Sequence, residues 1–352
     1  MARGPRIHVP DGWYHVMSRG NGGEAIYRSD EDRRRFLSLV AEVPARFGAE
    51  IHAFVLMDNH YHLLMRCRRA DVSETLRWLQ TAYAIRFNWA NNRRGHVFQG
   101  RFKSVLIREE EALDRVARYL HLNPVRIGGL GLDKDAQRRA RVTGCEDPGK
   151  ELVARRLKVL RDYPWSSWRA YAQLDRGPAW LTRDRIEAGC GGKSRQAQLA
   201  ALMEYTEAPI RQGRLDNPWE GLVGGTVLAE PAEAKALIRE AAKGSTDREK
   251  SNLEARLRTI PQWEHIVEAA EKLLGRKWES MAERYGDWGR DGTMAVATRA
   301  LGWRLSDVAK ALGCIEYATA AQGVRRFWKK AERNAEMRRF ATELPRKVSN
   351  RQ

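Results

Sequence analysis

The stretch Phe54-Val55-Leu56-Met57-Asp58-Asn59-His60-Tyr61-His62-Leu63-Leu64-Met65 decides the fold of the N-terminal part of this chain. Two apolar runs flank Asp58-Asn59, a pair typical of a tight turn, so the stretch predicts a β-hairpin. Alternate side chains of a strand share one face, so His60 and His62 point one way and Tyr61 the other. Two imidazoles on one sheet face can form half of a metal site, because histidine is the commonest metal ligand. The alternative is a pair of ordinary buried, hydrogen-bonded histidines.

Strands and helices alternate around this hairpin. The hairpin strands are expected over 51–57 and 60–67, with further strands over 13–18 and 102–107. Helices are expected after an N-cap at Asp30, over 72–92, and over 109–123 before Pro124, which cannot continue a helix. The order strand, helix, strand, strand, helix, strand, helix predicts an α+β domain with a ferredoxin-like βαββαβ antiparallel sheet and one appended helix.

The rest of the chain is organised differently. Residues 128–160 are polar, arginine-rich and weakly periodic, which predicts a mobile loop or insertion. The aromatic cluster over 163–168 is expected to pack back on the first domain, and the chain looks wholly helical from residue 181 onward. The predicted divisions are an N-terminal domain, an insertion with the aromatic segment, a helical linker region and a C-terminal domain, at 1–127, 128–180, 181–285 and 286–352.

The C-terminal domain has the pattern of a helix-turn-helix. A helix is expected over 305–312 with Ser306 as its N-cap, then a turn at Gly313-Cys314 and a second helix over 317–333. Short helix pairs also occur in all-α proteins that bind no nucleic acid. The charge of the second helix favours a DNA contact, for which the candidate residues are Arg325, Arg326, Lys329 and Lys330.

Net charge limits the class of partner. The chain carries 63 Lys and Arg against 45 Asp and Glu, a formal net charge of +18. Such an excess is costly in self-repulsion unless a polyanion relieves it, so nucleic acid is the first candidate and an anionic membrane the second. An inert basic surface is the remaining alternative. No apolar stretch is long enough to cross a bilayer, and the N-terminus lacks the apolar segment of a secretory signal, so a cytoplasmic location is expected.

The four cysteines, Cys67, Cys145, Cys190 and Cys314, are far apart. Without Cys-x-x-Cys spacing they indicate neither a disulfide framework nor a zinc knuckle.

Tyr119 and Asn123 lie four residues apart on the helix before Pro124, so they project from one face. Packed on the face that carries His60 and His62, this helix would bring a phenol and a carboxamide oxygen to a metal held by the two imidazoles. Three ligands leave coordination positions open, as a catalytic ion requires. The phenol is then a candidate nucleophile for a phosphodiester, with phosphate held by nearby arginines (Arg115, Arg118 and Arg126). Hydrolysis by an activated water, without Tyr119, and a Tyr119 ring that merely packs in the core are the alternatives.

A resemblance to a known family covers roughly residues 10–175. Met57-Asp58-Asn59-His60-Tyr61-His62-Leu63-Leu64 resembles the histidine-hydrophobe-histidine motif of the HUH single-strand endonucleases. The stretch Tyr119-Leu120-His121-Leu122-Asn123-Pro124-Val125-Arg126 resembles the nucleophile helix of their single-tyrosine transposases, most closely the REP-associated tyrosine transposases. Supporting motifs follow in the family's order at 14–16, 18–21, 95–104 and 163–167.

The resemblance implies a ferredoxin-like catalytic domain, a Mg²⁺ or Mn²⁺ ion and one tyrosine that forms a 5′-phosphotyrosine with single-stranded DNA. It assigns metal binding to His60 and His62, the third ligand to Asn123 and nucleophilic attack to Tyr119. Insertion-sequence relatives have glutamine where this chain has Asn123, and the insertion at 128–160 also departs from the family. The C-terminal half resembles a helical extension with a replication-initiator-like DNA-binding domain.

The expected activity is cleavage and rejoining of single-stranded or hairpin repeat DNA, in DNA transposition or recombination, inside a bacterial cell and at its nucleoid. The alternative is a domesticated, non-catalytic, sequence-specific DNA-binding regulator. Phosphate contacts are expected from Arg19, Arg101, Lys103 and Arg126, whereas His121 should point away from the site and pack. No membrane partner is expected, and the sequence leaves a monomer and a homodimer both open.

Overall fold

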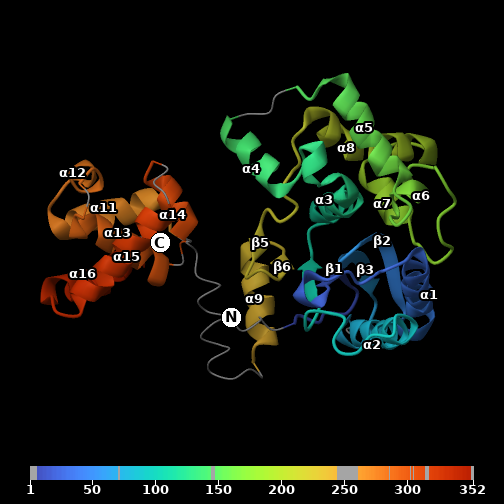
Figure 1. Cartoon of the computed structure of the whole chain (residues 1–352), viewed down its shortest axis with the longest axis horizontal. Helices are drawn as coiled ribbons and strands as arrows, with labels where there is room; N and C mark the ends of the chain where they lie inside the picture. Colours follow the sequence, from blue (N-terminus) through green and yellow to red (C-terminus); the bar gives the residue numbers. More distant parts are fainter. Residues whose placement is uncertain are drawn as a thin grey trace. The chain divides into compact units, whose positions relative to one another are not determined.

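The structure is a computed structural model that describes residues 6–69, 72–143, 147–243, 261–284, 286–301, 303, 305–313 and 317–349 (Figure 1). The chain forms two compact units, Met1–Thr246 and Asp247–Gln352. Cys145 and Cys314 lie outside the described residues. Within the described part of the chain, no helix combines the length and apolar character needed to cross a membrane.

The first unit is built on the predicted hairpin. Strands β2 (Ala49–Met57) and β3 (His60–Cys67) are antiparallel, with Met57 opposite His60 across the turn. Strand β1 (Gly12–Arg19) pairs antiparallel with β3 on one side and with β4 (Lys103–Ile107) on the other. The four strands expected from the sequence are therefore confirmed, in the order β2-β3-β1-β4.

Helices cover both faces of this sheet. Helices α1 (Asp30–Phe47) and α2 (Val72–Ala90) pack together (Figure 1). They lie on the face of the sheet to which Tyr61 points, where its ring contacts Phe36 of α1. Helix α3 (Glu110–His121) packs against β2 and β3 and buries an apolar stripe. The N-cap of α1 is Ser29, whose hydroxyl accepts from the Asp32 amide, so the expectation of Asp30 was wrong by one residue.

Two expectations about the sheet and the second half of the unit were wrong. Strands β5 (Leu222–Val223) and β6 (Val227–Leu228) extend the sheet, and β6 pairs parallel with β4. The sheet is therefore mixed, with six strands, rather than antiparallel, and the chain after residue 181 is not wholly helical. Strands of two residues are too short to show an alternating pattern, so the sequence carries no sign of them.

The expectation of a loop over 128–160 was also wrong. This region holds helices α4 (Lys134–Thr143) and α5 (Gly149–Asp162). Two short 3-10 turns, η2 (Asn123–Val125) and η3 (Gly128–Leu130), precede them. Helix α5 packs with a buried arginine: Arg156 donates to the Leu130 carbonyl at 2.8 Å and to the Ile210 carbonyl at 3.1 Å. Only Arg156 and Leu160 of α5 are buried, so a pattern based on apolar residues missed the helix.

The aromatic cluster packs on the first domain as expected. The backbone of 163–167 runs along β2: the Leu56 amide donates to the Trp165 carbonyl at 2.9 Å, and the Ser167 amide to the Phe54 carbonyl at 3.0 Å. The remaining helices of the unit are α6 (Trp168–Tyr171), α7 (Asp184–Gly189), α8 (Arg195–Gln212) and α9 (Pro231–Ala241).

The described part of the second unit is helical, with a core that includes Met294, Phe327 and Phe340. Its helices are α11 (Trp263–Leu274), α12 (Trp278–Ala282), α13 (Trp288–Arg299), α14 (Leu305–Ala311), α15 (Tyr317–Ala331) and α16 (Ala335–Ser349). Helices α14 and α15 contact one another. Ser306 lies inside α14, which begins at Leu305, so the expected N-cap was wrong. The fourfold division of the chain stays a prediction.

Candidate active site

The two motif histidines lie at the start of β3, on the face opposite Tyr61. Their ring centroids are 5.1 Å apart and their planes are nearly perpendicular. Nδ1 of His60 lies 2.8 Å from Oδ1 of Asn59, whose amide nitrogen donates to the Gly23 carbonyl at 3.0 Å. Since Oδ1 can only accept, Nδ1 of His60 carries the proton and Nε2 keeps a free lone pair.

A third histidine joins them. Nε2 of His15 on β1 lies 2.8 Å from Nδ1 of His62, and the two rings are stacked with centroids 5.0 Å apart. Both side chains are buried. One ring nitrogen of this pair donates and the other accepts, so Nε2 of His62 is not engaged in the contact.

All three imidazoles are held in the neutral form. Burial lowers the pKa of His15 to about 3 and that of His60 to about 4, and the Arg19 charge acts on His60 in the same direction. Burial, reinforced by the neighbouring histidines and Arg126, holds the pKa of His62 well below its usual value. Neutral imidazole is the form that binds a metal ion.

Helix α3 brings Tyr119 to these rings. The Tyr119 ring centroid lies 5.5 Å from that of His62 and 6.2 Å from that of His15, both edge to face. The Arg126 guanidinium lies over the phenol ring at 5.1 Å. Burial raises the pKa of the Tyr119 hydroxyl, and the Arg126 charge and the Asn123 carboxamide oppose that rise. The phenol is therefore protonated at neutral pH and has a cation beside it.

Asn123 is buried just after α3, which ends at His121, two residues earlier than expected. Its amide nitrogen donates to the Tyr119 carbonyl at 2.8 Å. This bond ties the position of Asn123 to that of Tyr119 and uses the nitrogen, so the carboxamide oxygen is the atom suited to a hard cation.

Sequence reasoning missed two residues that contact Tyr119 or its neighbours. Trp219, between α8 and β5, lies with its ring 5.3 Å from that of Tyr119 and 4.9 Å from that of His15. No periodic signal points to it. His15 could have been found from strand alternation, because β1 places Met17 opposite His62 and His15 on the same face two residues away.

The arginines expected to hold phosphate have different partners in the structure, and one of them contacts Tyr119. Arg126 contacts Tyr119, whereas Arg118 is paired with Asp216 and stacks on Tyr205, and Arg115 lies 3.7 Å from Glu109. Arg19 is exposed at the end of β1, opposite His60 in the register, and the two remaining cations, Arg101 and Lys103, are also exposed.

His121 has the packing role expected for it. It is buried between the rings of Trp168 and Tyr171, and its Nε2 lies 3.1 Å from the Ser167 hydroxyl. His96 is exposed in the loop before β4.

On α15, three of the four expected DNA contacts are exposed: Arg325, Lys329 and Lys330. Arg326 has another role in this structure. Its guanidinium forms a bidentate pair with buried Asp291 of α13, at 2.6 and 2.9 Å.

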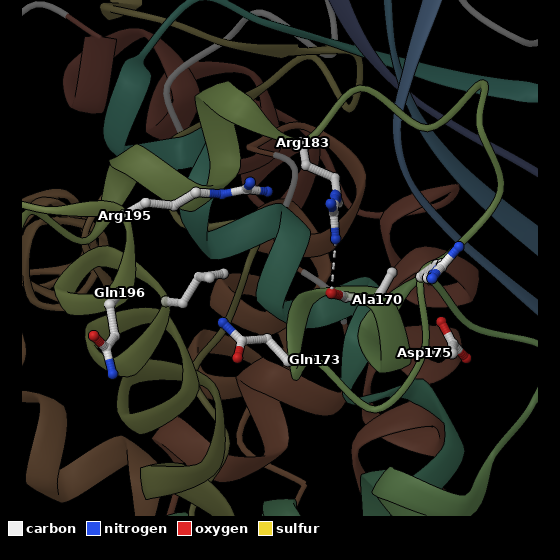
Figure 2. Close-up of a pocket in the computed structure, with 8 residues that line it drawn as sticks. Ala170, Gln173, Asp175, Arg183, Arg195 and Gln196 are labelled. Atoms are coloured by element: carbon white, nitrogen blue, oxygen red, sulfur yellow. Dashed lines mark hydrogen bonds between the residues drawn. The ribbon is translucent and has the colours of Figure 1, made fainter.

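A large pocket lies apart from the histidines, with a volume of about 710 Å³ (Figure 2). Arg183 donates to the Ala170 carbonyl there at 2.9 Å. Arg195 makes a bidentate contact with buried Glu187, and Arg183 lies 3.4 Å from the same carboxylate. Because both guanidinium groups already pair with Glu187, this pocket is a weaker candidate functional site than the histidine cluster.

The donor set of the histidine cluster fits a divalent cation. Nε2 of His60 and of His62 and the oxygen of Asn123 are a mixed nitrogen and oxygen set of the kind that Mg²⁺ and Mn²⁺ tolerate. Among the described residues, no three His, Cys, Asp or Glu side chains are grouped so that they could hold a metal. An ion held here would therefore depend on the Asn123 oxygen and on water or substrate oxygens.

Parts of this chain are similar to known proteins. No curated protein matches the sequence. One solved structure that matches, described as "Structure of the REP associates tyrosine transposase bound to a REP hairpin", has 16% identity and a TM-score of 0.36, covering 55% of this chain and 99% of its own. The family model described as "Transposase IS200 like" matches residues 8–123, which hold all three histidines, Tyr119 and Asn123. Over this segment, which is about a third of the chain, the sequence is similar to the IS200-like transposase family.

Proposed function

We propose that this protein is a metal-dependent DNA transposase that cleaves and rejoins single-stranded or hairpin repeat DNA through a 5′-phosphotyrosine on Tyr119. The observation that carries the proposal is the contact between the Tyr119 ring and His62, with centroids 5.5 Å apart. A phenol beside two neutral imidazoles with available lone pairs is the arrangement that metal-assisted tyrosine attack on a phosphodiester needs.

The proposed metal ligands are His60, His62 and Asn123. A bound Mg²⁺ or Mn²⁺ would polarise the scissile phosphate and neutralise charge as the phosphorus is attacked. Ligation through Nε2 of His62 requires the proton on Nδ1, so His15 accepts that hydrogen bond and orients the ring.

In the covalent step, Oη of Tyr119 forms a bond to phosphorus as the bond from phosphorus to the 3′ oxygen breaks. The phenol loses its proton and the leaving 3′ oxygen gains one, so the products are a 5′-phosphotyrosine and a free 3′ hydroxyl. Attack by a 3′ hydroxyl reverses the step and rejoins DNA. Arg126, over the phenol ring, favours the phenolate and the phosphate charge.

Other elements of the structure support the proposed fold of the catalytic domain and the proposed DNA contacts. The order β1-α1-β2-β3-α2-β4, followed by α3, supports a ferredoxin-like catalytic domain. Helices α14 and α15 support a helix-turn-helix that holds a duplex stem through Arg325, Lys329 and Lys330. Near the catalytic site, Arg19, Arg101 and Lys103 would contact phosphates of the single strand.

The test is covalent capture. Single-stranded and hairpin DNA labelled at the 3′ end is incubated with the protein and Mg²⁺, then analysed on a denaturing gel. The expected result is a labelled protein adduct with the native protein, none with Tyr119→Phe, and an unchanged adduct with the control Tyr205→Phe. Cleavage by Tyr119→Phe without an adduct would indicate hydrolysis by water and overturn the proposal.

A non-catalytic DNA-binding regulator is the second candidate. The exposed cations of α15 favour it, since they belong to a compact unit separate from the one that holds Tyr119. This function predicts hairpin binding without any adduct, and binding that disappears when the second unit, Asp247–Gln352, is removed.

A further inference from the structure

One segment of the first unit carries only positive charge. Residues 75–108 contain six arginines and one lysine, and no aspartate or glutamate. The segment runs from the first turn of α2 through the following loop to the residue after β4. Arg86 and Arg94, on either side of the end of α2, are exposed and form no ion pair with any described residue. This concentration of charge favours a polyanion.

The same segment holds an unusually exposed aromatic side chain. Trp89, in the last turn of α2, is 86% exposed, and Ile85, one turn earlier, is 66% exposed. Among the described large hydrophobic residues that are exposed, Trp89 alone is aromatic. A flat indole left in water beside arginines is suited to stacking with a nucleic-acid base, because every base has a π-face and the arginines can take the phosphates.

The loop after Trp89 leads to the end of β1, next to the start of β3. Asn88 donates to the Gly95 carbonyl at 2.9 Å, which closes the loop against the last turn of α2. Further along, the Gln99 amide donates to the Arg19 carbonyl at 2.8 Å, and Arg19 stands opposite His60 in the register of β1 and β3. The charged segment therefore runs from Trp89, on the Tyr61 face of the sheet, to the sheet edge at which the His60 strand begins.

We propose that Trp89 is a stacking platform for a base of the single-stranded DNA, with Arg86 and Arg94 holding the adjacent phosphates. This inference rests on the proposed function, because it takes the strand that Tyr119 attacks as the ligand. A second copy of the chain is a poorer fit. In a twofold contact the same cations would face one another with no acidic residue in the segment to pair with them.

DNA binding can be measured separately from DNA cleavage. Fluorescence anisotropy of a labelled oligothymidylate, with the Tyr119→Phe protein in EDTA, reports affinity alone. Trp89→Ala is expected to weaken binding by about 5- to 100-fold, and Trp89→Phe to weaken it less, because a phenyl ring still stacks. Leu174→Ala is the matched control, since that side chain is also exposed, at 45%, but lies outside the charged segment. Its affinity should be that of the parent.

Salt dependence tests the arginines. Replacing both Arg86 and Arg94 by glutamine should reduce the slope of log affinity against log salt by about 1.4, at roughly 0.7 for each phosphate that the protein no longer neutralises. An oligonucleotide that carries iodouracil should cross-link to Trp89 on irradiation, and the peptide is identified by mass spectrometry.

Unchanged affinity of Trp89→Ala would overturn the inference. So would light scattering that shows Trp89→Ala converting a dimer into a monomer with the same affinity for DNA. Failure of the proposed function is a separate result: the native protein would form no adduct, while Trp89→Ala would still bind DNA more weakly than the parent.

Discussion

The hydrogen bond between His15 and His62 can be tested by two substitutions that differ in one property. His15→Leu removes the ring nitrogen that lies 2.8 Å from Nδ1 of His62. His15→Gln keeps a polar group that can accept a hydrogen bond in nearly the same place. His15 is not one of the proposed metal ligands. The two variants therefore test how His62 is oriented without removing any ligand.

The size of the effect follows from the burial of the pair. When the Nε2 atom of His62 binds a cation, its Nδ1 carries a proton, and in His15→Leu that buried N–H has no acceptor. Leaving such a donor unsatisfied costs about 1 to 3 kcal/mol. Metal affinity should therefore fall by roughly 10- to 100-fold in His15→Leu, the range typical when a ligating histidine is deprived of its hydrogen-bond partner, and by much less in His15→Gln.

The assay is titration with Mn²⁺, with the free ion followed by electron paramagnetic resonance, so it does not depend on cleavage. Thermal unfolding without metal checks that both variants are folded. Equal Mn²⁺ affinity of His15→Leu and the native protein would refute the reasoning. Equal weakening by the leucine and the glutamine variants would show that His15 acts by packing alone.

Two further predictions concern stability. Burial lowers the pKa of His121 to about 3, whereas an unfolded histidine titrates near 6.5, so the unfolded state takes up the proton first. The stabilisation from neutral His121 is complete above pH ~6.5 and is lost as pH falls toward 3, by about 2 kcal/mol at pH 5. Urea unfolding of His121→Gln should therefore depend less on pH over this range than that of the native protein, and an equal dependence would contradict the assignment. In the second unit, Asp291→Asn breaks the bidentate pair with Arg326 and should destabilise that unit by about 3 kcal/mol. Calorimetry of the whole chain checks this, with the exposed-pair variant Glu343→Gln as the control; equal melting of the two variants would argue against it.

Features that depend on near neighbours in the sequence were predictable. The hairpin around Asp58-Asn59 and the common face of His60 and His62 follow from strand alternation. The end of α3 before Pro124 follows from the missing amide proton of proline. The approach of Tyr119 to the histidines was inferred because the apolar stripe of α3 had to pack on the sheet, and the structure places it there.

Errors arose where local patterns were short or ambiguous. The two-residue strands β5 and β6 are too short to have a periodic pattern. They form because β6 pairs with the edge of β4. Helix α5 was not predicted because one of its buried residues, Arg156, is polar and breaks the apolar pattern. The Arg156 guanidinium is buried because it donates hydrogen bonds to carbonyls of two segments distant in the sequence. In both cases the stabilising partner lies outside the window in which a sequence pattern can be read.

The sequence by itself determined the four main strands of the sheet, the paired imidazoles of His60 and His62, and the similarity of residues 8–123 to a transposase family. Only the tertiary structure decided which other groups meet them: His15, 47 residues before His62, and Trp219, which lies against Tyr119. These contacts depend on strand order, register and the path of the chain after α8, all of which are set by packing and hydrogen bonds between segments far apart in the sequence. Periodicity along one strand or helix carries no information about such pairings.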